Sequence, residues 1–154
     1  MSVQVQAKFP SVEWFHALQE LVDSHQEQYR RLGYADSRAL FRVKADGDMQ
    51  NDRTFAVVFE VYSCVEVREL GSDEIDAFDP DWILEGPYSD WKEMIENIRA
   101  NGSADSDHTL NRLSLLQHPF RIYGDDQTRV DQFYRQQFSY QEFIDESAAI
   151  DTIF

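Results

Sequence analysis

Apolar residues recur with helical spacing in some segments of the chain and alternate with polar residues in others. Over residues 11–32 they recur every three or four positions between Pro10 and Gly33, which predicts a long amphipathic helix. Over residues 37–45 and 54–62 they alternate, and a turn-rich segment containing Asp and Gly separates the two runs. The pattern therefore predicts a helix followed by the two strands of a hairpin.

The next segments predict a third strand, a loop and a fourth strand. Residues 63–70 alternate, with Val65 and Val67 on one face and Cys64 on the other. Residues 71–80 are acidic and predict a loop. The apolar residues that follow run into a Gly-Pro pair at 86–87, which ends the fourth strand.

A short amphipathic helix is predicted directly after this Gly-Pro pair. Ser89 stands where an N-cap is expected, so that the helix begins near Asp90, and the Asn-Gly pair at 101–102 ends it. Its apolar residues fall at i, i+3, i+4 and i+7 and form one inward stripe. They are Trp91, Met94, Ile95 and Ile98.

The last third of the chain predicts another helix, a short strand and a final helix. Leucines three positions apart indicate a helix within residues 104–116, and Pro119 separates it from a strand at 120–123. Helical spacing returns from Val130, and we expect this last helix to break near Phe138. The order of elements fits an α+β fold with helices packed on one face of a sheet.

The length of 154 residues and the absence of repeats or low-complexity linkers predict a single domain over residues 1–154. A lone cysteine excludes an intrachain disulfide, and its apolar, β-prone surroundings predict a buried thiol. The N-terminal segment lacks the pattern of a secretory signal, and the apolar runs are too short to cross a bilayer. We therefore expect a soluble cytoplasmic protein without stable membrane insertion.

Charge bears on the partners of the protein. The chain carries 29 acidic and 14 basic residues, which gives a formal net charge of −15 at pH 7. Such a charge repels phosphate backbones, so nucleic acid is excluded as an expected partner. The acidity indicates either colloidal solubility or an acidic face that docks on a basic partner enzyme.

Motifs that carry catalysis or bind cofactors are missing from the sequence. It has no nucleophile elbow, phosphate-binding glycine loop, dinucleotide fingerprint or Cys-x-x-Cys pair. The acidic segment 46–52 departs from a calcium loop, because Val57 stands where a bidentate Glu is needed. We therefore expect a non-enzymatic protein with no metal site and no cofactor.

Large apolar and aromatic side chains occupy the predicted inward faces of most elements. An ordinary core and a ligand cavity have the same composition, so both interpretations stay open at this point. Inward residues that could line a cavity include Phe41, Phe59, Leu110 and Leu113.

The segment from Asp81 to Asp125 resembles the sterol carrier protein type-2 family. The resemblance rests on an apolar strand ending at Gly86, a helix bearing Trp91, a Leu-spaced helix, and a strand closing with Gly124 and Asp125. With the upstream helix and hairpin it extends over about residues 9–144, as in a bacterial-type single-domain member.

This resemblance implies a five-stranded, mostly antiparallel sheet with helices on one face around an apolar tunnel. It implies binding or transfer of a fatty acyl chain, a sterol or a related lipid, without catalysis. The implied tunnel lining comprises the stripe of the Trp91 helix, Trp82 and Leu84 on the sheet, and Phe133 and Phe138 on the closing helix.

Two other functions stay open. In the first, the protein is an accessory or catalytic component of lipid or steroid metabolism, in which Asp81 or Glu85 acts together with His108 on a bound substrate. In the second, it is an interaction module whose acidic face docks on a basic partner.

Overall fold

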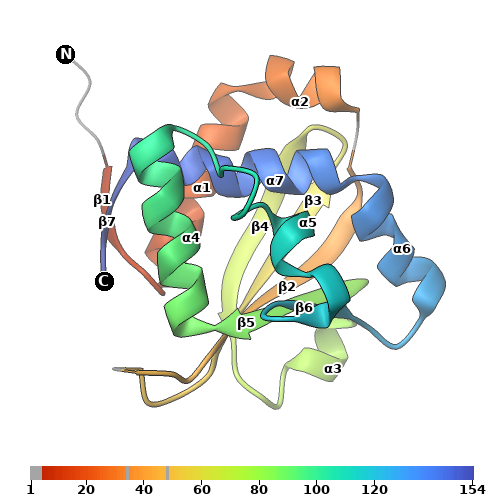
Figure 1. Cartoon of the computed structure of the whole chain (residues 1–154). Helices are drawn as coiled ribbons and strands as arrows, with labels where there is room; N and C mark the ends of the chain where they lie inside the picture. Colours follow the sequence, from red (N-terminus) through yellow and green to blue (C-terminus); the bar gives the residue numbers. More distant parts are fainter. Residues whose placement is uncertain (1–4, 34, 48) are drawn as a thin grey trace.

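The computed structural model describes residues 5–33, 35–47 and 49–154 and shows helices packed against a sheet (Figure 1). The strands are β1 (Val5–Lys8), β2 (Ser37–Lys44), β3 (Arg53–Glu60), β4 (Ser63–Leu70), β5 (Trp82–Pro87), β6 (Arg121–Tyr123) and β7 (Ile150–Ile153). The helices are α1 (Val12–Ser24), α2 (Gln26–Leu32), α3 (Ile75–Phe78), α4 (Tyr88–Asn101), α5 (Leu110–Leu113), α6 (Gln127–Arg135) and α7 (Gln137–Asp145). Two short 3-10 helices, η1 (Leu115–Gln117) and η2 (Glu146–Ala149), complete the described elements.

The main sheet has five strands in the order β4-β3-β2-β5-β6. Its neighbours are antiparallel except for β2 and β5, which are parallel. The α+β class and the five-stranded, mostly antiparallel sheet are therefore confirmed. A second, two-stranded sheet pairs β1 with β7 in parallel, and no pattern in the sequence predicted it.

The main core lies between one face of the sheet and the helices. Alternate residues of each strand point to this face because successive side chains in a strand point to opposite sides. On β2, for example, Ala39, Phe41 and Val43 are completely buried in the main core. Helices α1, α4 and α7 cover this face (Figure 1).

The opposite face of the sheet is partly covered as well. Helix α3 places Phe78 in a smaller cluster with Leu40, Ile83 and Leu70. The prediction of a loop over residues 71–80 is therefore wrong at its centre, because the apolar side chains of this segment gain burial by forming one helical turn over the sheet.

Two predicted helices differ from the observed ones at their ends. The first is interrupted at His25, whose backbone is non-helical, so that α1 and α2 replace one long helix. Helix α4 begins at Tyr88 with Pro87 in the N-cap position, so Ser89 is not the cap. The Ser89 hydroxyl and backbone N–H instead donate to the carboxylate of Asp46 in the β2–β3 loop.

The C-terminal helical region breaks at Gln136, two residues before the predicted position. In α6, Val130 and Phe133 point inward. The break changes the helical phase, so that in α7 Tyr140 and Phe143 point inward instead of Phe138. The prediction that Phe138 faces the interior is wrong, since this side chain is 70% exposed.

An irregularity in the pairing of β3 with β4 changes the orientation of side chains on β4. Glu66 pairs with Val58 but Cys64 pairs with Phe59, so Val65 has no partner of its own. Such a bulge shifts the alternation by one residue. Cys64 and Val67 are consequently both buried while Val65 is exposed, contrary to the predicted alternation, whereas the predicted buried thiol is confirmed.

Candidate functional site

The residues predicted to line a ligand site converge on the main core. Ten of the twelve are buried there, and Leu113, which is half-buried, packs against them. The ten are Phe41, Phe59, Trp82, Leu84, Trp91, Met94, Ile95, Ile98, Leu110 and Phe133. We refer to this set of ten as the central cluster.

Phe41 lies at the middle of the central cluster. Its ring centroid is 5.6 Å from Trp82, 6.2 Å from Trp91 and 5.9 Å from Phe143. Edge-to-face and offset arrangements at such distances are favourable for aromatic rings. Strands β2 and β5 and helices α4 and α7 are thus joined through a single side chain.

Two further residues belong to this region: Tyr140, which sequence reasoning missed, and Phe143, which the pattern placed on an inward face but not in the site. Tyr140 is 4.8 Å from Trp82 and 5.1 Å from Phe59, measured between ring centroids, and Phe143 is 5.1 Å from Phe59. Their spacing of three residues is a helical signal. Only the break at Gln136 puts Tyr140 on the inward face in place of Phe138.

The central cluster is closely packed. Five hollows stand out in the described part of the chain, and only Phe59 of the predicted lining residues borders one of them. That hollow, beside Tyr29 and Val61, has a volume of about 10 Å³, too little for a lipid. The apolar tunnel therefore stays a prediction, since the side chains expected to line it fill the space between them.

A few polar groups lie within this apolar region. The Tyr140 hydroxyl is 2.8 Å from Ser37 Oγ and donates to Gln136 Oε1 at 2.6 Å. Burial raises the pKa of Tyr140 to about 12, so the phenol stays protonated. The Trp82 Nε1–H is near this hydroxyl, but it is buried without a hydrogen bond of good geometry.

The residues of the catalytic alternative are held by separate contacts. Asp81 accepts from Arg129 Nε and from the backbone N–H of Arg38, each at 2.7 Å. Glu85 lies 3.2 Å from Arg42 Nη1. His108 contacts Asp105 and Glu93, and within the described residues its hydrogen bonds and ion pairs include neither Asp81 nor Glu85.

His108 links the α4–α5 loop to α4. Its Nδ1 is 2.6 Å from Asp105 Oδ1 and its Nε2 is 3.3 Å from Glu93 Oε2. These carboxylates, Asp105 first, raise the pKa of His108 above its ordinary value of 6.5, while the same contact lowers the pKa of Asp105. A raised histidine pKa contributes stability that is fully present below the unfolded value and is lost as pH rises through the folded value.

We therefore expect the stability contributed by this group to fall as pH rises above about 6.5. His108→Gln should cost more stability at about pH 6 than at about pH 8. Urea unfolding at both values measures the difference, and the ring proton shifts of His108 report its pKa directly. His16→Gln is the matched control, since exposed His16 bonds to Gln19 and pairs with no carboxylate among the described residues. Equal pH dependence in wild type and His108→Gln would contradict this assignment.

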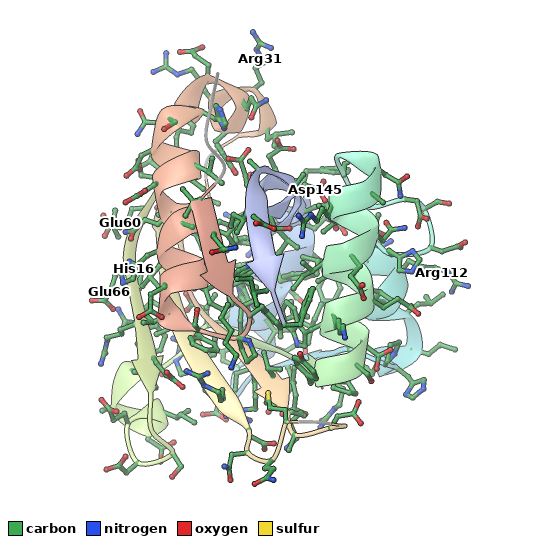
Figure 2. The ribbon with its side chains drawn as sticks, turned by 90° about the vertical axis from the view of Figure 1, so that its left-hand side faces the viewer. His16, Arg31, Glu60, Glu66, Arg112 and Asp145 are labelled. Carbon is green, nitrogen blue, oxygen red and sulfur yellow. The ribbon has the colours of Figure 1, made fainter. Side chains whose placement is uncertain are left out.

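Glu146 is another buried carboxylate, 2.9 Å from His25 Nδ1, whereas many other charged side chains lie at the surface. Figure 2 shows His16, Glu60 and Glu66 extending outward on one side of the molecule and Arg112 on the other. Over residues 5–33, 35–47 and 49–154, no three His, Cys, Asp or Glu side chains gather in a way that would hold a metal ion. In the same ranges no helix has the length and apolar character needed to span a bilayer.

Comparison with known proteins gives similarity at the level of structure. Neither a protein-family model nor a curated protein matches the chain. A crystal structure of sterol carrier protein 2 superimposes with a TM-score of 0.63 over 90% of this chain and 95% of that one, at 13% identity. The chain has a sterol carrier protein 2-like fold.

A second solved structure agrees with this assignment of the fold. A conserved hypothetical protein from Thermus thermophilus, which carries a provisional sterol carrier protein name, matches with a TM-score of 0.62 at 14% identity. The match covers 97% of this chain and 96% of the other. The sterol carrier protein 2-like fold thus extends over nearly the whole length of each.

Proposed function

We propose that this chain is a single ligand-binding domain that holds an apolar ligand, such as a fatty acyl chain, a sterol or a related lipid, without catalysing a reaction on it. The site is the space now filled by the central cluster. The supporting observation is that a sterol carrier protein 2-like fold brings ten of the twelve predicted lining residues into one cluster.

Ligand entry requires part of the helical layer to move, because the cluster is filled. Helix α6 buries Val130 and Phe133, whereas α4 buries four large side chains. At about 1.5–3 kcal/mol for each buried side chain, lifting α6 costs about 3–6 kcal/mol and lifting α4 about 6–12 kcal/mol. Movement of α6 is therefore the favoured route.

Contacts at the start of α6 are compatible with such movement. Arg129 holds it to exposed Asp79 at 2.9 Å and to the largely buried carboxylate of Asp81 at 2.7 Å. An exposed ion pair such as the one with Asp79 contributes little to stability, typically about 0–1 kcal/mol. Gln132 Oε1, on the same helix, is buried without a partner, which further lowers the cost of displacing α6.

Trp82 supplies a polar anchor for the ligand. Its Nε1–H makes no hydrogen bond of good geometry within the described residues, although the Tyr140 hydroxyl lies near it, and its ring packs on Phe133 of α6 with centroids 5.0 Å apart. Leaving a buried donor unsatisfied costs about 1–3 kcal/mol, which a ligand hydroxyl or carboxylate would recover. We expect the bound lipid to place its polar end there.

The net charge of −15 favours delivery to a partner enzyme in the cytoplasm over transfer between anionic membranes. In this proposal the acidic surface keeps the carrier away from negatively charged bilayers. Its ligand is then passed to a protein and not to a membrane.

The test is native mass spectrometry of the freshly purified protein, with lipid analysis of an organic extract and titration with a dansyl-labelled fatty acid. We expect a stoichiometric adduct that is lost on denaturation. Trp82→Phe should weaken probe binding about five- to tenfold, the effect of one hydrogen bond. Trp14→Phe is the matched control, because Trp14 Nε1 already donates to Thr152 Oγ1 at 3.0 Å.

Absence of an adduct together with absence of probe binding would refute the proposal. An equal loss of affinity in both tryptophan variants would retain the lipid site but remove the anchoring role of Trp82.

A further inference from the structure

A surface cleft is lined by residues from the end of β1, the start of α4, the β2–β3 loop and the C-terminus. Figure 1 shows the ribbon of these segments on one side of the molecule. Its volume is about 320 Å³, within the range of small-molecule sites. Its lining residues are Lys8, Phe9, Pro10, Met49, Arg53, Tyr88, Lys92 and Phe154. We call it the cationic cleft.

The charge of this cleft opposes that of the whole protein. Its lining has three basic residues and no acidic one, although acidic residues outnumber basic ones by 29 to 14 in the chain. Two of the three lysines in the sequence, Lys8 and Lys92, are found here. By contrast, the hollow beside Gly86 contains three acidic residues, as does the one beside Tyr123.

The three cations have different partners. Arg53 is held in place by Glu69, at 2.7 and 2.8 Å, and by the carbonyl oxygen of Pro10, and Glu13 lies near enough to act on it electrostatically. Lys8 and Lys92 form no ion pair with any residue in the described ranges. Two ammonium groups are thus available to an anion.

Aromatic rings form the apolar part of the cleft. Phe9 is completely buried and lies parallel to Tyr88, with an interplanar angle of 12° and a centroid distance of 6.4 Å. Phe154 meets Phe9 at 65° and 6.3 Å, and Lys92 Nζ lies 5.3 Å from the centre of the Phe154 ring. Flat apolar surfaces therefore lie directly beside Lys92 and line the same cleft as Lys8.

We propose that the cationic cleft binds a small aromatic carboxylate. The ring of the ligand packs against Phe154 and Tyr88, and its carboxylate accepts charge-assisted hydrogen bonds from Lys8 and Lys92. Only a ligand with both groups makes both kinds of contact. A neutral aromatic compound would lack the ionic contacts, and a simple anion would lack the apolar ones. This site is separate from the central cluster and does not depend on lipid binding.

The experiment titrates ¹⁵N-labelled protein with 2-naphthoate and, separately, with the neutral 2-naphthylmethanol. For 2-naphthoate we expect amide shifts confined to residues of the cleft, a dissociation constant below about 1 mM, and weaker binding as salt shortens the Debye length. The neutral compound should bind at least tenfold more weakly. The double variant Lys8→Gln/Lys92→Gln should lose at least tenfold in affinity for 2-naphthoate.

Lys44→Gln is the matched control. Lys44 is the third lysine, pairs with Asp52 at 2.9 Å and lies outside the cleft, so its removal should leave affinity unchanged. Equal affinity for the two compounds would overturn the proposal, as would no shifts up to about 10 mM. Shifts at residues of the central cluster would also overturn it, except at Trp91, which directly precedes Lys92 and packs on Phe9 with ring centroids 5.8 Å apart. The spectra also show whether each variant is folded. Lipid binding is measured in a separate experiment, so failure of this proposal can be distinguished from failure of the proposed lipid site.

Discussion

Phe41→Ala should lower the free energy of unfolding by about 3–5 kcal/mol, the range for truncation of a fully buried phenylalanine. Phe41 is completely buried and its ring packs against those of Phe15, Trp82, Trp91 and Phe143. The void left by its ring cannot be filled by these rigid neighbours without moving strands or helices. Urea unfolding followed by tryptophan fluorescence measures the loss.

Phe138→Ala is the matched control for this substitution. It removes the same side chain from a position that is 70% exposed, so stability should change by no more than about 0.5 kcal/mol. Comparable losses in the two variants would contradict the inward and outward orientations assigned to these residues. The Phe41→Ala protein should also be stabilised by benzene more than the wild type, because an apolar cavity of this kind binds such molecules.

Gly86→Ala should also be strongly destabilising, at the upper end of the 1–3 kcal/mol range for overpacking, about 3 kcal/mol. A Cβ atom at this position of β5 would overlap the ring of Phe120. That ring is completely buried and packs on Trp91 at 5.1 Å, and the Phe120 N–H donates to the carbonyl oxygen of Leu113 at 3.0 Å. Neither partner can move aside cheaply.

A double-mutant cycle tests the cause of this effect. Adding Phe120→Leu to Gly86→Ala should recover at least about 1 kcal/mol relative to the sum of the two single changes, because the smaller side chain vacates the overlapping space. Gly71→Ala is the control, since the nearest atoms to its Cβ would be the carboxylate oxygens of Asp73 and Glu74, at the ends of side chains that can rotate away. Strict additivity would exclude the steric explanation.

Much of the sheet and of the central cluster could be predicted from local patterns. Alternation identified β2 and β3, and the stripe of Trp91, Met94, Ile95 and Ile98 is buried as expected. These predictions succeeded because each depends on the period of a single element. The side chains on the buried face of a helix or strand recur with the period of that element, so apolar residues recur with the same period in the sequence.

Features that depend on pairing between distant segments could not be predicted. The bulge at Val65 arises from the register of β4 against β3, and α3 forms because the outer sheet face offers Phe78 a place to pack. The inward position of Tyr140 follows from the break at Gln136, whose position local spacing placed two residues too late. In each case the tertiary contact and not the local period determines which side chain is buried.

The parallel pairing of β1 with β7 has a consequence for the order of folding during synthesis. Gln6 bonds to Asp151 across a separation of 145 residues, and the Phe9 N–H donates to the carbonyl oxygen of Ile153. All five strands of the main sheet are translated before β7, so the sheet can assemble while β1 still lacks its partner. On the ribosome, β1 therefore emerges before the strands of the main sheet but is fixed in place only after them.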